Sequence, residues 1–103
     1  MSREEFRQSV MHWANRIGVK PRRVQVQRLT RKWASCSTAG RLTFSTDLLA
    51  ADHAFRNEVI VHELVHLIAP NHGRLFKSLL RAHLGKKLKD RIAACSFEAA
   101  ERS

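Results

Sequence analysis

The sequence predicts an α+β domain in which an amphipathic helix precedes a small antiparallel sheet and three further helices follow. Apolar residues recur at helical spacing near the N-terminus and again through the second half of the chain, whereas the region 24–45 contains short segments that alternate apolar and polar residues as strands do. A length of 103 residues suits one domain, 1–103, with a single modest core and no separate recognition module.

The first helix is expected between Ser2 and Gly18. Ser2 and Glu5 have the spacing of a capping box, Gly18 is placed to end the helix, and apolar residues recur every three or four positions: Phe6, Val10, Trp13, Ala14 and Ile17. Three strands are expected over residues 24–29, 32–37 and 41–45, with Ala39-Gly40 as the turn before the last of them. We expect these strands to pair as an antiparallel sheet.

The next element, residues 54–69, is a predicted helix that carries the most informative motif. His62-Glu63-Leu64-Val65-His66 is an H-E-x-x-H sequence in a helix that is apolar nearly all round and therefore buried. One helical turn separates the histidines, so both imidazoles can bind one zinc ion, with Glu63 beside the open coordination position as a general base. The pentapeptide also arises by chance, but buried histidines and a glutamate need compensation for lost hydration, which a metal provides.

A catalytic zinc takes three protein ligands, so one more is needed. The candidates are His12, His53, His72, His83, Glu98 and Glu101. His72 is favoured because Pro70 halts the helix, and the turn formers Asn71 and Gly73 can bring His72 back under the metal. His83 or the C-terminal glutamates would place the ligand on a later helix, and they remain the alternative. Two helices, residues 75–84 and 88–100, are expected after this turn.

The residues around the motif resemble a known family. His62 to Leu67, followed by Asn71-His72-Gly73 and then Phe76, resembles the YgjP-like metallopeptidase pattern H-E-L-x-H-L…N-H-S…F. Upstream, residues 31–37 resemble the family's R-W-G-S-C-S segment, and residues 41–49 resemble the strand that follows it. The same layout is similar to the SprT-like and WLM groups of DNA-protein crosslink proteases.

The resemblance has two departures and a clear implication. Ala34 stands where the family usually has glycine, and Gly73 replaces the usual serine after the third histidine. The resemblance implies a minimal zincin-like fold, one zinc ion per chain and hydrolysis of peptide bonds. It points to His62, His66 and His72 as the metal ligands.

The charge of the chain suggests an anionic partner. Nineteen Lys and Arg stand against nine Asp and Glu, a formal charge of +10, while 44% hydrophobic residues argue for a folded chain. A basic globular domain most often meets nucleic acid, and solvated surface charge is the alternative. The predicted nucleic-acid-binding cluster precedes and borders the sheet: Lys20, Arg22, Arg23, Arg28, Arg31 and Lys32.

Cysteines and hydropathy exclude other classes of protein. Cys36 and Cys95 are far apart and lack C-x-x-C spacing, which argues against a disulfide framework and a cysteine zinc site. No apolar stretch has the length of a membrane span, and the N-terminus lacks the apolar region of a signal peptide. We therefore expect a cytoplasmic protein with no membrane partner.

The predicted function is zinc metalloendopeptidase, acting on protein or peptide substrates that include DNA-associated proteins. A zinc hydrolase of nucleoside triphosphates, a pyrophosphatase, would use the same metal and suits the basic charge. A DNA-binding module with a non-catalytic zinc would need the charge but not Glu63. A subunit whose cleft is completed by a partner is the third alternative, because a domain this short leaves its cleft thinly walled.

Overall fold

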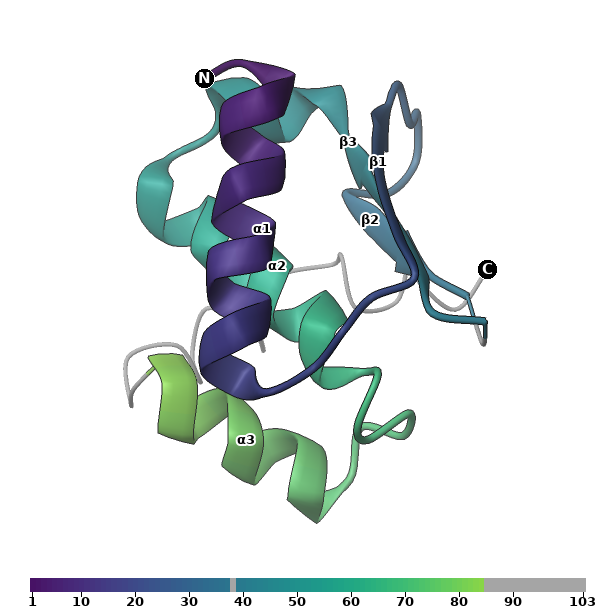
Figure 1. Ribbon diagram of the computed structural model, residues 1–103, viewed down its shortest axis with the longest axis vertical. Helices are drawn as coiled ribbons and strands as arrows, with labels where there is room; N and C mark the ends of the chain where they lie inside the picture. Colours follow the sequence, from purple (N-terminus) through teal and green to yellow (C-terminus); the bar gives the residue numbers. More distant parts are fainter. Residues whose placement is uncertain (38, 85–103) are drawn as a thin grey trace.

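The computed structural model describes residues 1–37 and 39–84. Its elements, in chain order, are α1 (Arg3–Ile17), β1 (Arg23–Gln27), β2 (Ala34–Cys36), β3 (Arg41–Ser45), the short 3-10 helix η1 (Thr46–Ala50), α2 (His53–Val65) and α3 (Arg74–Leu84). Figure 1 shows α1 lying over α2, the sheet to one side of this helix pair, and α3 crossing below them. The predicted helix over residues 88–100 lies outside the described residues.

The capping box predicted for α1 is present. The Ser2 hydroxyl accepts a hydrogen bond from the Glu5 amide at 3.0 Å, and the Ser2 amide donates to the Glu5 carboxylate at 2.8 Å. Gly18 ends the helix in the left-handed conformation, with φ of 90°, and its amide donates to the Ala14 carbonyl. The buried face of α1 is Phe6, Val10 and Ala14.

The sheet is mixed, so the prediction of an antiparallel sheet is wrong. β3 is the central strand, with β1 parallel to it on one side and β2 antiparallel to it on the other. A tight turn at Gly40 joins β2 to β3, whereas the longer link over residues 28–33 lets β1 and β2 reach opposite edges of β3. Leu42 and Phe44 of this central strand are fully buried and pack against residues of α1 and α2 in the core.

Two hydrophobic clusters divide the interior. The first cluster joins α1, the sheet and α2 through Phe6, Val10, Phe44, Ile60 and Leu64 among others. The second cluster joins α2 to α3 through Val61, Val65, Ala69, Phe76 and Leu80. None of the helices in the described part of the chain combines the length and the apolar character needed to cross a lipid bilayer.

Candidate metal centre and substrate cavity

The C-terminal half of α2 presents the H-E-x-x-H motif from inside the protein. Asp52 caps the start of this helix, its carboxylate accepting from the amides of Ala54 and Phe55 at 3.1 and 3.3 Å. His62 and Glu63 have no exposed surface, and His66, the last residue of the motif, is half-buried. The neighbours of His62 and Glu63 along α2 belong to both hydrophobic clusters, Leu64 to the first and Val61 and Val65 to the second.

The chain after α2 reverses and returns His72 to the other two histidines. α2 ends at Val65, four residues earlier than predicted, and residues 66–68 form turns instead of a last helical turn. Nitrogen atoms of His62, His66 and His72 all lie within 4.8 Å of one another. The Nε2 atoms of His66 and His72 are 3.0 Å apart.

This donor set fits a zinc ion. Three imidazoles are a common zinc ligand set, and tetrahedral coordination with Zn–N bonds of about 2.0–2.1 Å separates the ligand nitrogens by about 3.3 Å. The separations of the histidines are therefore close to what a shared metal requires. For a metal ion to lie between His66 and His72, their Nε2 atoms would have to move apart only slightly from the present 3.0 Å.

Glu63 lies beside the first histidine. Its Oε2 atom is 3.4 Å from Nδ1 of His62, and a carboxylate can only accept, so this contact favours a proton on Nδ1. The lone pair of the His62 ring is then on Nε2, which is the usual position for a metal-binding histidine whose other nitrogen donates to a carboxylate.

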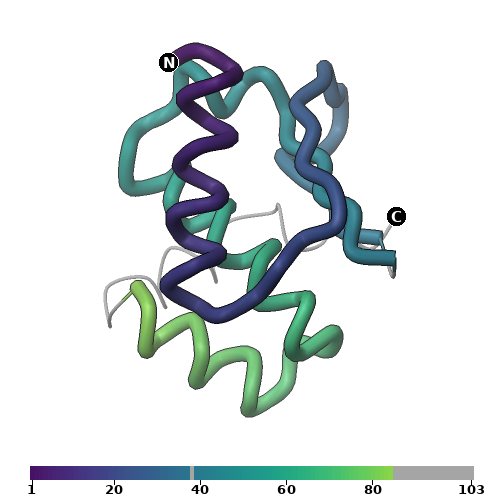
Figure 2. Tube along the Cα trace, viewed as in Figure 1, coloured from purple at the N-terminus to yellow at the C-terminus, as the bar shows by residue number. Residues whose placement is uncertain are grey.

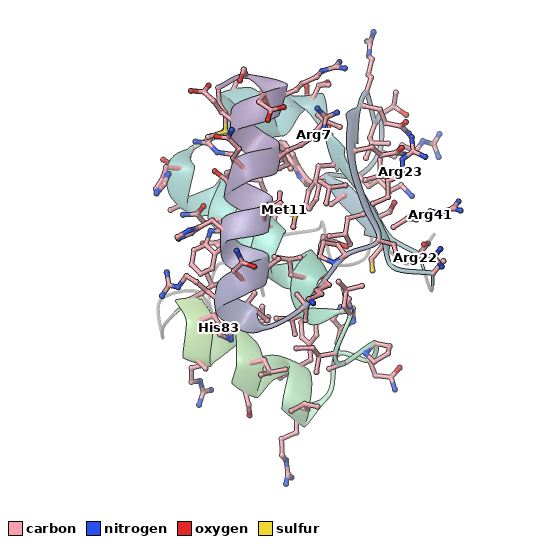
Figure 3. The ribbon with its side chains drawn as sticks, in the orientation of Figure 1. Arg7, Met11, Arg22, Arg23, Arg41 and His83 are labelled. Carbon is pink, nitrogen blue, oxygen red and sulfur yellow. The ribbon has the colours of Figure 1, made fainter. Side chains whose placement is uncertain are left out.

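The other described candidates for the third ligand lie elsewhere. His12 is exposed on α1, His53 begins α2 and contacts Asn57 at 3.2 Å, and His83 lies near the end of α3, as Figure 3 shows. None of these three belongs to the histidine group described above. Glu98 and Glu101 lie outside the described residues.

A cavity of about 870 Å³ opens beside His66 and His72. Three segments form its walls: the link from α1 to β1, the end of β2 with the turn that follows, and the loop after α2. In Figure 2 the link from α1 crosses in front of the end of α2 on its way to the sheet. The wall residues are Val19, Lys20, Arg22, Cys36, Ser37, Ala39, Gly40, Leu67, Pro70 and Asn71.

The predicted basic cluster divides into two groups. Lys20 and Arg22 line the cavity, and Arg23 begins β1 beside them. Arg28, Arg31 and Lys32 belong to the link after β1, about 16 Å further along the strand direction. Arg41, which the prediction left out, pairs with Arg23 across the sheet, and Figure 3 shows both on the sheet side of the molecule.

Part of the cavity wall was missed by sequence reasoning, although the sequence does single out Lys20, Arg22 and the turn at Pro70 and Asn71. Val19 and Gly40 are far from the histidines in sequence and belong to no motif, and the segment that holds Ser37 was matched to the family without being placed beside the histidines. The sequence offered one signal, the glycine turn before β3, and that turn does form a wall. Its place beside the histidines depends on the sheet topology, which the sequence pattern did not predict correctly.

Comparison with known proteins supports the family resemblance. The sequence model of the YgjP-like metallopeptidase domain matches residues 1–91. Comparison with curated proteins finds no match. Among solved structures, the metallopeptidase zymogen abylysin of Pyrococcus abyssi is similar, with 22% identity over 86% of this chain and 92% of that chain and a TM-score of 0.70.

The metallopeptidase zymogen jannalysin of Methanocaldococcus jannaschii is similar in fold as well, with 22% identity over 86% of this chain and 90% of that chain and a TM-score of 0.76. At this identity the two structures establish the shared fold. The match of the domain model over most of the chain establishes more: the chain belongs to the YgjP-like metallopeptidase family.

Proposed function

We propose that this metallopeptidase is a zinc-dependent endopeptidase in which His62, His66 and His72 hold the metal and Glu63 is the general base. The observation that carries the proposal is the three-histidine group at the wall of a cavity large enough for several peptide residues. The donor set favours zinc over magnesium or calcium, which prefer oxygen ligands.

The chemistry divides between the metal and Glu63. A zinc ion supplies a Lewis acid that polarises the scissile carbonyl and acidifies water. Glu63 accepts the proton of the attacking water and passes it to the amine that leaves. Its carboxylate lies 3.4 Å from Nδ1 of His62, next to one of the proposed metal ligands. Burial of Glu63 keeps bulk water from competing for this proton.

The edge of the sheet offers a place for the peptide backbone. β2 pairs with β3 on one side only among the described strands, and Cys36 and Ser37 at its end line the cavity. An extended peptide that adds to this edge would run past His66 and His72. Main-chain hydrogen bonds do not depend on the side chains of the peptide, so this edge would bind peptides of many sequences. Such binding suits an enzyme that cleaves within a chain.

The test compares wild type with Glu63→Gln on unstructured protein substrates. The variant should bind the metal and unfold at the same temperature as wild type, while its turnover falls by about 10²–10⁴-fold, the usual contribution of a general base. Equal turnover would contradict the mechanism. Hydrolysis of nucleoside triphosphates that depends on Glu63, without peptide hydrolysis, would instead favour the pyrophosphatase alternative.

DNA-associated proteins are the narrower substrate class that the charge of +10 suggests. Three basic residues outside the cavity walls can test it: Arg23, Arg28 and Arg31. If they contact phosphates, replacing them with glutamine should reduce the slope of log Kd for DNA against log salt by about 2.7. An unchanged slope would mean that these charges are ordinary solvated surface.

A further inference from the structure

We infer that the cavity beside the histidines selects peptides that carry an acidic side chain close to the scissile bond, and that Lys20 and Arg22 bind its carboxylate. The inference rests on the proposed peptidase function and names a determinant of its specificity. Both cations line the cavity, which also reaches His66 and His72. A side chain bound against the cations therefore belongs to a residue near the reacting bond.

Arg22 is held in the cavity wall by the turn before β3. Its backbone amide donates to the Gly40 carbonyl at 2.9 Å. A Cβ atom at Gly40 would lie 3.3 Å from Cγ of Arg22, so the arginine stem packs against the bare glycine backbone. Gly40 also has φ of 86°, which other residues rarely adopt. The turn thus fixes the backbone and the first part of the side chain of Arg22.

Lys20 is placed by the end of α1. The amides of Gly18 and Val19 both donate to the Ala14 carbonyl, at 2.8 and 3.0 Å, which fixes where the link leaves the helix. Val19 then packs against the first hydrophobic cluster. Lys20 follows directly and its side chain is exposed at the cavity wall.

The charge around these two cations is not neutralised by the protein. Within residues 1–37 and 39–84, neither Lys20 nor Arg22 takes part in an ion pair, and no carboxylate lines the cavity. The exposed acids, Glu4, Glu5, Asp47 and Asp52, gather around η1 and the first turn of α1, where the N-terminal amine bonds to the Leu49 carbonyl. The 15 residues of α1 separate that end from the link by about 22 Å.

A carboxylate suits this cavity better than a nucleic acid. Val19, Leu67 and Pro70 supply apolar wall beside the two cations, so the cavity resembles a side-chain pocket. Binding of a nucleic acid backbone needs a track of cations that follows successive phosphates. Of the other residues of the predicted cluster, Arg23 lies beside the cavity, whereas Arg28, Arg31 and Lys32 lie at the other end of β1.

The experiment uses full-length metal-loaded protein and pairs of peptides that differ only by Asp or Asn at one position near the cleavage site. Wild type should cleave the Asp peptide with kcat/KM about 10-fold higher, and this advantage should disappear in Lys20→Gln/Arg22→Gln. The matched control, Arg41→Gln/Lys77→Gln, removes two exposed cations outside the cavity and should keep the preference. The reversal Lys20→Glu/Arg22→Glu should make a Lys peptide the better substrate.

Binding gives a second measurement that does not need turnover. Fluorescence anisotropy on the Glu63→Gln variant should show about 10-fold tighter binding of the labelled Asp peptide than of its Asn partner, again lost without Lys20 and Arg22. A single-stranded oligonucleotide serves as competitor. In one outcome the oligonucleotide displaces the labelled peptide at a lower concentration than unlabelled Asp peptide does. If that displacement also requires Lys20 and Arg22, the two cations bind a polyanion and the inference is wrong.

The remaining outcomes separate the inference from the proposed function. Equal cleavage of the Asp and Asn peptides by wild type overturns the inference and leaves the peptidase function intact. An Asp preference that survives in Lys20→Gln/Arg22→Gln overturns the assignment to these two residues. No cleavage of any peptide, together with Asp-selective binding by the Glu63→Gln variant, overturns the proposed function while the binding inference stands.

Discussion

Phe76 of α3 lies edge-on against His62 of α2, with ring centroids 5.0 Å apart and ring planes at 78°. The same phenylalanine is 4.7 Å from the rings of both His66 and His72, and only 1% of its surface is exposed. Edge-to-face ring pairs contribute about 0.5–1.5 kcal/mol beyond the area they bury. One residue of α3 therefore restrains the orientation of all three imidazoles.

Replacing this ring should weaken metal binding more than it weakens the fold. Phe76→Leu keeps an apolar side chain but cannot pack edge-on, so we expect about 10-fold lower metal affinity in a chelator competition. Phe6→Leu is the matched control, because Phe6 is equally buried and makes a similar edge contact with Phe44 in the other cluster. Similar losses of affinity in both variants would mean that Phe76 acts through general stability.

The metal itself can be counted. Wild type should bind one zinc ion per chain by elemental analysis, and His62→Ala, His66→Ala and His72→Ala should each lose it, because two imidazoles bind zinc weakly. His83→Ala is the control, since His83 lies outside the histidine group. Zinc retained by His72→Ala but lost from His83→Ala would move the third ligand to α3.

Gly40 and Gly73 should respond differently to alanine. Gly40→Ala should destabilise the fold by more than about 1 kcal/mol, since its φ is 86° and a Cβ would press on Arg22. A Cβ atom at Gly73 would meet no other atom within 4 Å, so Gly73→Ala should be neutral or stabilise by about 0.4–1 kcal/mol. Urea unfolding measures both, and equal effects would contradict the strain at Gly40.

The capping box should make the stability of α1 depend on acid pH. Hydrogen bonds from Ser2 hold the pKa of Glu5 below its ordinary value of 4.5. A lowered pKa in the folded state means that this stabilisation is complete above pH 4.5 and is lost as the pH falls through the folded value. The stability difference between wild type and Glu5→Ala in urea unfolding should thus be larger at pH 7 than at pH 3, because only the ionised Glu5 gains from the Ser2 hydrogen bonds.

The features that sequence reasoning predicted correctly have local causes. The capping box of Ser2 with Glu5 and the alternation around Leu42 and Phe44 each act over a few residues. The turn at Pro70 to Gly73 is local too, and the structure brings His72 to the other histidines. The roles of these histidines as ligands stay a prediction.

The errors have non-local causes. Which edge of β3 takes β1 depends on packing against α1, not on the pattern of β1 itself. The predicted end of α2 is too late because Ala69 is buried after the helix has ended, so the apolar periodicity continues through the turn. The predicted basic cluster is divided because Lys20 and Arg22 precede β1 while Arg28, Arg31 and Lys32 follow it, so the strand separates the two groups. The distribution of charge along the sequence does not show this separation.

The division of the interior into two clusters has a consequence for local unfolding. α3 is held by the second, smaller cluster, so it can open while the sheet and most of α1 stay closed. His72 leads into α3, and a metal shared with His62 would close that opening. Amide exchange in α3 should therefore be fast after a chelator has removed the metal, and its rate should fall as metal is added. Exchange at Phe44 in the sheet should change little. Hydrogen exchange would then reveal occupancy of the metal centre without any substrate.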